Sequence, residues 1–237
     1  MWFVFTHERM FTRSRVCAAG AVAVIAGAAA ADTWTEIGDA GQLPGSEQII
    51  GGTGALTQII GNISSNVDVD LFRIYISDPA AFSASSTGGA SFNTNMALFD
   101  ASGMGVIGDD DAYGTDQSAL SSGSIFSPTS PGEYLLAITN YANSASSVDG
   151  DIFSFDAGAM GDDGNLVAGP DGIGGNLAID LWNNDDIYLR TDATGGYIIN
   201  LTGAESIGSG GGTVIPLPSA AGMGLVGLLI VASRRRR

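Results

Sequence analysis

Among the side chains that could act in catalysis or bind metal, carboxylates are by far the most frequent in this sequence. The chain has 25 Asp and Glu residues but one histidine, His7, one cysteine, Cys17, and no lysine. Because His7 and Cys17 precede residue 32, the rest of the chain offers no imidazole, thiol or amine side chain. Ser-His-Asp and Cys-His catalysis, Schiff-base chemistry and His/Cys zinc sites are therefore excluded there. Paired carboxylates of the glycosidase type are the one common mechanism that stays open.

The densest acidic group is Asp109, Asp110 and Asp111, with Asp116 shortly after it. Hard cations prefer carboxylate and carbonyl oxygen, so this stretch is a candidate calcium site. Its spacing differs from that of an EF-hand loop, which places ligands at alternate positions and a glycine at the sixth. A solvated acidic loop without metal is the alternative that we favour, and no other cofactor is expected.

Two further features allow more than one interpretation. Asp68 and Asp70 alternate onto the face that Phe72 continues, where they either bind metal or end a strand, and we favour the second. Trp182 is either a platform for stacking carbohydrate or a core residue, and a lone tryptophan beside a strand favours the core.

Most of the basic residues lie at the two ends of the chain. All nine are arginines, and only Arg73 and Arg190 lie between residues 32 and 233, where 24 acidic residues accompany them. A body of this charge repels nucleic acid and anionic lipid headgroups, so neither is expected as a partner of the body. The terminal arginines are Arg9, Arg13, Arg15, Arg234, Arg235, Arg236 and Arg237.

Short alternating runs dominate the body between the two ends. Phe72, Ile74 and Ile76 share one face of the run 68–77, and runs at 93–103, 132–141 and 195–203 are patterned similarly. A period of two is typical of strands, and no run sustains a helical period. We therefore predict an all-β body over residues 32–207, built as a β-sandwich or jelly roll. The stretches 177–186 and 195–203 are expected to add a final pair of strands to it.

The first 31 residues have the layout of a secretory signal peptide. Three arginines precede an apolar run at 16–28, and Ala29, Ala30 and Ala31 form a small-residue cleavage site. We predict a signal helix over residues 1–31 that signal peptidase removes after Ala31, recognising Ala29 and Ala31. The alternative, a buried N-terminal helix, has little to pack against.

The last 24 residues combine two prolines, an apolar run and an arginine cluster. Pro216 and Pro218 precede an uncharged stretch at 219–233, which Arg234 to Arg237 close. The uncharged run from Val214 reaches about 20 residues, enough to span a bilayer, but its prolines and glycines make it a poor permanent helix. We predict a hydrophobic helix at 214–237 that anchors the chain transiently, joined to the body by a flexible Gly-rich linker at 208–213.

The order of the predicted strands resembles a known family. The segments DVDLFRIYI, NTNMALFDASGMGVIGDDDAYGTDQSAL and PGEYLLAITNY are similar to the bacterial pre-peptidase C-terminal domain over residues 61–141. That resemblance implies a small β-sandwich of the kind appended to secreted proteases and other surface proteins. The closing strand of the family is not evident after Asn143.

The C-terminal layout resembles the PEP-CTERM sorting signal, with Leu217 where the name-giving motif has Glu. The resemblance implies that an exosortase, a membrane-embedded cysteine protease, reads Pro216, Pro218 and the four arginines during export. An ordinary single-pass anchor is the alternative, and cleavage alone separates the two.

Three functional classes follow, in order of preference. The first is an exported, non-catalytic acidic protein of the cell surface or extracellular matrix, associated with extracellular polymer. The second is an accessory module that binds glycan or protein, and the third is a carboxylate-dependent hydrolase.

Overall fold

The computed structural model describes residues 31–112, 114–154, 167–184 and 194–208, which form strands and no helix. The prediction of an all-β body is thus confirmed over these residues. None of their elements is a helix long and apolar enough to cross a membrane. The predicted signal helix, most of the linker and the sorting tail, with Ala29, Pro216, Pro218 and Arg234 to Arg237, lie outside the described residues.

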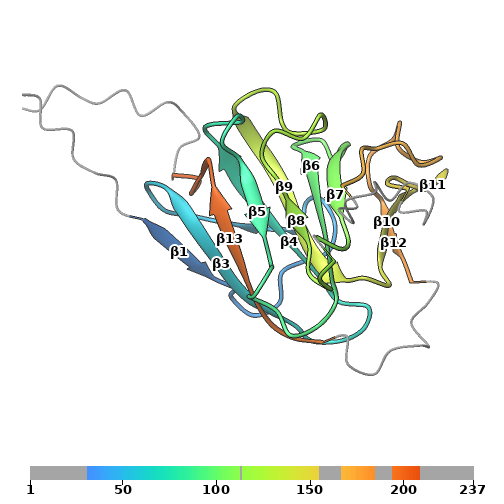
Figure 1. Ribbon diagram of the computed structural model, residues 1–237, viewed down its shortest axis with the longest axis horizontal. Coiled ribbons are helices and arrows are strands. Elements are labelled where there is room, and N and C mark those ends of the chain that lie inside the picture. Colours follow the sequence, from blue (N-terminus) through green and yellow to red (C-terminus); the bar gives the residue numbers. More distant parts are fainter. Residues whose placement is uncertain (1–30, 113, 155–166, 185–193, 209–237) are drawn as a thin grey trace, which may run out of the picture.

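A five-stranded sheet forms one layer of the body (Figure 1). Its strands, in spatial order, are β1 (Asp32–Thr35), β3 (Leu56–Ile63), β13 (Gly195–Thr202), β5 (Ser83–Ser85) and β8 (Ala119–Leu120). The β1 strand pairs with β3 in parallel, whereas the other neighbours are antiparallel. The first strand of the body therefore lies at an edge, with its end beside β3.

A six-stranded sheet forms the second layer. The order along it is β14 (Ala204–Glu205), β4 (Val69–Ile76), β9 (Gly132–Asn140), β6 (Thr94–Asp100) and β7 (Gly105–Asp109), and β2 (Gln48–Ile49) pairs with β4 in parallel. The remaining pairs are antiparallel. Two of the strands predicted from alternation, at 68–77 and 132–141, thus pair directly as β4 and β9.

The main core lies between these two sheets. Phe72, Ile74 and Ile76 of β4 meet Tyr197 and Ile199 of β13 in one buried cluster, as their alternation predicted. Two mixed sheets facing each other across such a core are consistent with a β-sandwich. The strands β1, β3 and β13 are needed to cover β4, so the folded body extends beyond residues 61–141.

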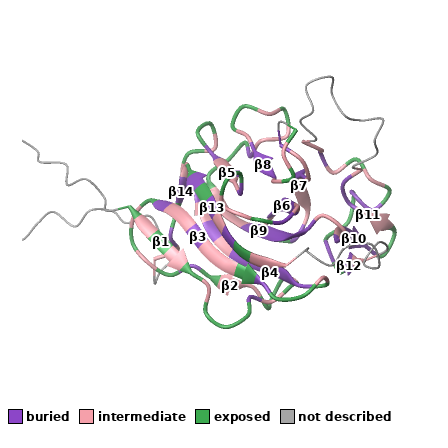
Figure 2. Cartoon of the chain, turned by 60° about the horizontal axis from the view of Figure 1, so that its bottom comes forward, coloured by how far each residue is buried: buried purple, intermediate pink, exposed green. Residues whose placement is uncertain are grey.

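The six-stranded sheet is also covered on its other face. Leu71, Phe99 and Leu135 point away from the main core into a second buried cluster with Phe153 and Trp182. Figure 2 shows the resulting burial along β4, β9 and β6. Strands buried on both faces carry apolar side chains at consecutive positions, as Met96 to Phe99 of β6 and Leu135 to Ile138 of β9 do.

A small three-stranded sheet provides much of this second cover. It consists of β11 (Gly150–Asp151), β10 (Ser144–Ser147) and β12 (Leu181–Asn183). The ring of Trp182 is buried edge-on against Phe99, and its Nε1 donates to the Gln42 carbonyl at 2.9 Å. The prediction that Trp182 is a core residue is confirmed.

The expected final pair of strands is only half correct. The run at 195–203 forms β13 of the five-stranded sheet, but 181–183 pairs with β10 in the small sheet instead of joining it. The physical reason is Trp182, because its place in the second core requires β12 to lie over the outer face of β6.

Phe99 offers a test of the second core. Replacing Phe99 with Ala removes the ring that Phe153 and Trp182 both contact, at centroid separations of 5.8 and 6.4 Å. We expect the free energy of unfolding to fall by about 3–5 kcal/mol in denaturant titration. Ile125→Ala is the control, since its side chain is 90% exposed and the change should be within about 0.5 kcal/mol. Equal small effects of the two substitutions would show that the second core contributes little.

Candidate functional site

Three carboxylates gather at the start of β4, and we call Glu36, Asp39 and Asp70 the acidic cluster. One oxygen from each lies within 4.8 Å of the others. Asp70 is fully buried, Glu36 is half-buried and Asp39 is exposed. Among the residues that the structure describes, no other group of three His, Cys, Asp or Glu side chains meets in this way.

Tyr197 attaches Asp70 to the opposite sheet. Asp70 faces the core side of β4, and the Tyr197 hydroxyl on β13 donates to its Oδ2 at 2.6 Å. The backbone neighbour of Tyr197 across the ladder is Gly61 of β3. A Cβ at Gly61 would overlap the Tyr197 hydroxyl and crowd Glu36 Oε2, so only glycine lets both side chains lie over β3 at this point.

Glu36 reaches the cluster because β1 runs parallel to β3. Its backbone N–H donates to the Ile60 carbonyl at 2.8 Å, which continues the ladder beyond Thr35. Its Oε1 then accepts from the Ala40 amide at 3.0 Å, and its Oε2 accepts from the Asn62 amide at 2.9 Å. Two backbone donors therefore fix the orientation of this carboxylate.

The Asp70 carboxylate is buried beside other carboxylates, without a positive charge to offset its own. Its Oδ1 is buried and accepts no hydrogen bond from the protein. Burial raises the pKa of Asp70 to about 8, the Tyr197 hydroxyl opposes that rise, and the Glu36 and Asp68 carboxylates add to it. Burial and the adjacent Asp70 also raise the pKa of Tyr197, which stays a hydrogen-bond donor.

No described basic side chain neutralises the acidic cluster. Arg73 is the one arginine in the described part of the chain, and it pairs with Glu47 and Glu133 instead. Its Nη1 lies 3.2 Å from Glu133 Oε2, and its other contacts are to Glu47 Oε1. Burying unpaired negative charge is costly, so the cluster requires either a proton or a bound cation.

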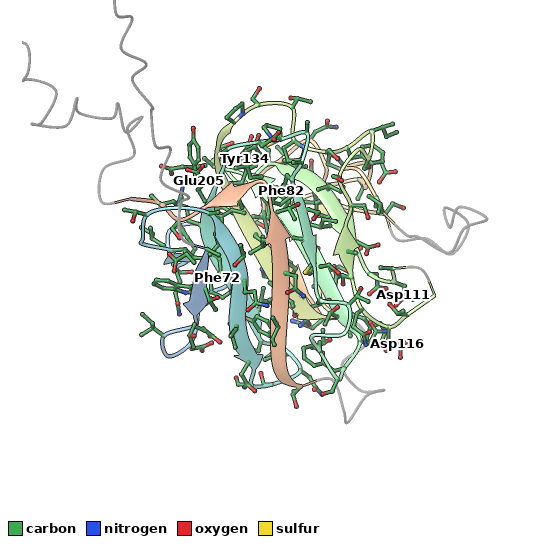
Figure 3. The ribbon with its side chains drawn as sticks, turned by 60° about the vertical axis from the view of Figure 1, so that its left-hand side comes forward. Phe72, Phe82, Asp111, Asp116, Tyr134 and Glu205 are labelled. Carbon is green, nitrogen blue, oxygen red and sulfur yellow. The ribbon has the colours of Figure 1, made fainter. Side chains whose placement is uncertain are left out.

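The acidic stretch predicted to bind calcium lies elsewhere. Figure 3 shows Asp111 and Asp116 on the opposite side of the molecule from Phe72, which is two residues beyond Asp70. Asp109 is buried and accepts a hydrogen bond from the Ala119 amide, while Asp116 is exposed. Burial raises the pKa of Asp109 to about 7, against the Ala119 hydrogen bond and with help from Asp111.

No three of the carboxylates of Asp109, Asp110, Asp111 and Asp116 meet at one point in the structure. Calcium binding by these residues stays a prediction. The carboxylate of Asp68, in contrast, accepts from the Ser64 amide and shapes the turn before β4. Asp68 therefore stabilises the turn that precedes β4. The interpretation that Asp70 also ends a strand is wrong, because Asp70 is the second residue of β4 and belongs to the acidic cluster.

Sequence reasoning missed Glu36 and Asp39. A signal was present, because Asp70 occupies a core-facing position and a buried carboxylate needs partners. The partners could not be chosen from 24 acids without knowing that β1 lies beside β3.

Comparison with known proteins adds no relative to this picture. No family model, no curated protein and no solved structure matches the chain.

The buried acids predict how stability depends on pH when no metal is bound. Between about pH 4 and 8 the folded chain holds a proton at Asp70 that the unfolded chain has released, so the free energy of unfolding falls as pH rises through this window. Asp70→Asn should flatten that fall, leaving a smaller one from Asp109 between about pH 4 and 7.

Urea unfolding at several pH values, in the presence of chelator, measures this dependence. At pH 8 we expect Asp70→Asn to be at least as stable as the unsubstituted chain, because its amide still accepts from Tyr197 and carries no charge. Asp149→Asn, at an exposed turn residue, should keep the original slope. Parallel curves for the chain and Asp70→Asn would contradict the assignment of a raised pKa to Asp70.

Proposed function

We propose that this chain is an exported acidic protein of the cell surface or extracellular matrix, without catalysis of its own. Signal peptidase removes residues 1–31, and an exosortase reads the PEP-CTERM-like tail at 214–237, which anchors the chain in the membrane transiently. The body is a β-sandwich with a region similar to the pre-peptidase C-terminal domain, flanked by the signal helix and the sorting helix.

The observation that carries this proposal is that the first described strand and the last described bridge lie next to the two predicted processing segments. The first described strand begins at Asp32, one residue after the predicted cleavage site, and the last bridge joins Ile207 to Gly51 just before the Gly-rich linker. Asp32 Oδ2 accepts from the Ser206 hydroxyl at 2.8 Å, so the two ends of the body meet. Removing both terminal segments would leave every described strand in place, as processing at both ends requires.

The new N-terminus would also be accommodated. The Asp32 nitrogen donates to the Ala55 carbonyl at 2.7 Å, and the ammonium group that cleavage creates can make the same bond. Ala31, on the other side of the scissile bond, is exposed.

The acidic cluster supports a body without catalysis better than a hydrolase. A glycosidase needs two carboxylates that flank a sugar bond in an open cleft. Asp70 is fully buried and bound to Tyr197, so its carboxylate does not face a polymer.

A glycan-binding module is the second candidate. Stacking on sugars requires exposed aromatic rings, but no aromatic side chain is exposed in the ranges that the structure describes. Trp182 is buried, Tyr141 is half-buried, and Tyr113 falls outside those ranges. These residues favour the surface or matrix role over sugar recognition.

Signal cleavage is tested by the mass and N-terminal sequence of the exported protein. We expect the mature chain to begin at Asp32. Ala31→Leu should block processing, because signal peptidase needs a small residue at the cleavage site, whereas Ala30→Leu at the intervening position should be processed normally. A mature chain that begins upstream of Val16 would show that the segment is retained.

The tail is expected to direct sorting without contributing to the fold. Ending the chain at Gly208 should leave the melting temperature within about 2 °C, since every described strand is complete by Glu205. Replacing Arg234 to Arg237 with serine should reduce surface delivery, and replacing them with lysine should preserve it, because the positive-inside rule depends on charge. Unfolding of the shortened chain would make the tail structural.

A further inference from the structure

We propose that the acidic cluster is a calcium site, in which Glu36, Asp39 and Asp70 each supply a carboxylate oxygen to one ion held between the end of β1 and the start of β4. This site is separate from the acidic stretch at 109–116 and is independent of how the chain is exported.

The three carboxylates lie close enough together to bind one calcium ion. Calcium binds oxygen at about 2.3–2.6 Å, so two ligands on opposite sides of one ion lie at most about 5 Å apart. One oxygen each of Glu36, Asp39 and Asp70 meets that limit, with every separation within 4.8 Å. Glu36 and Asp39 thus meet Asp70, more than 30 residues further along the chain, at a point that a single ion can reach.

One carboxylate oxygen of Asp70 is buried without a hydrogen-bond partner. A buried polar atom without a partner is rare in folded proteins and needs an explanation. Asp70 Oδ1 is such an atom, in a side chain with no exposed surface, and it belongs to the carboxylate of the acidic cluster. A calcium ion supplies the missing interaction.

No positively charged side chain among the described residues compensates the acidic cluster. Glu36, Asp39, Asp68 and the Tyr197 hydroxyl are the titratable groups around Asp70, and none of them is cationic. Arg73 is committed to Glu47 and Glu133. A divalent ion would offset most of the negative charge here, and no described side chain does so.

Two of the three candidate ligands, Glu36 and Asp70, are already oriented by hydrogen bonds. The amides of Ala40 and Asn62 hold Glu36, Tyr197 holds Asp70, and Gly61 leaves room for both. Each of these carboxylate oxygens still has a lone pair for metal. Exposed Asp39 completes the set from the solvent side, where water can fill the remaining coordination positions.

Calcium is preferred to magnesium because of the ligand set. Magnesium demands a near-ideal octahedron at about 2.0–2.1 Å, whereas calcium accepts six to eight oxygens in flexible arrangements. Ligands from a loop, a strand end and a rigid strand are better suited to the flexible coordination.

The test uses the full chain, stripped of metal with chelator and titrated with calcium chloride at constant ionic strength. We expect calorimetry to give a single saturable site and the melting temperature to rise with calcium. Asp39→Asn should weaken calcium affinity at least tenfold without changing the metal-free melting temperature by more than a few degrees, because Asp39 is exposed. Asp149→Asn, also an exposed carboxylate, is the matched control and should bind as the unsubstituted chain does.

Two further variants locate the site. Asp70→Asn should abolish binding, and Asp39→Asn keeps the test decisive if Asp70→Asn does not fold. The triple change of Asp109, Asp110 and Asp111 to Asn should leave calcium affinity unchanged. Terbium, which replaces calcium, should show tyrosine-sensitised luminescence that Tyr197→Phe weakens, because that ring touches a ligand of the ion.

Three results would overturn the proposal. They are no calcium-dependent heat or stabilisation at millimolar calcium, unchanged affinity in Asp39→Asn, and loss of binding only in the triple variant. Equal stabilisation by magnesium and calcium would reject the choice of ion. An exported protein that is sorted normally but binds no calcium would refute this site while leaving the proposed function intact.

Discussion

The hydrogen bond from Tyr197 to Asp70 crosses from one large sheet to the other and determines what the neighbouring side chains must do. It holds a carboxylate in the gap between β4 and β13, where water does not reach it. Gly61 must then lack a side chain, and Glu36 must approach over β3. The edge strand β1, the central strand β4 and the later strand β13 are thereby joined at one point.

All charges at this point have the same sign. The one arginine among the described residues, Arg73 on β4, pairs instead with Glu47, just before β2, and with Glu133 on β9. At the acidic cluster, two backbone amides and one hydroxyl orient the carboxylates but do not neutralise them. A calcium ion from the extracellular medium would do so, which connects the cluster to the proposed export of the chain and stabilises the folded state by mass action.

Alternation in the sequence predicted the strands of the main core, because alternate side chains of a strand point to the same face. Phe72, Ile74 and Ile76, and likewise Tyr197 and Ile199, lie where that pattern places them. The second core and the small sheet were not predicted. Ser144–Ser147 is short and carries no clear pattern, and the strand expected at 177–186 was assigned to the main sandwich instead of the small sheet. The place of Trp182 in a core followed from its residue type, but its partner Phe99 did not.

The candidate site was only partly predictable for a related reason. The core-facing position of Asp70 was visible in the sequence, whereas its partners depend on the parallel pairing of β1 with β3, which is a long-range contact. The stretch at 109–116 was chosen only because it holds many acidic residues close together in sequence. A metal site requires that carboxylate oxygens meet in space, as those of Glu36, Asp39 and Asp70 do.

Anomalous diffraction from crystals of the protein grown with calcium tests the central claim most directly. We expect an anomalous peak, within about 2.6 Å of oxygens from Glu36, Asp39 and Asp70, that disappears when calcium is replaced by magnesium. An acidic cluster without a peak at saturating calcium, with Asp70 hydrogen-bonded to Glu36 through a shared proton, would contradict it.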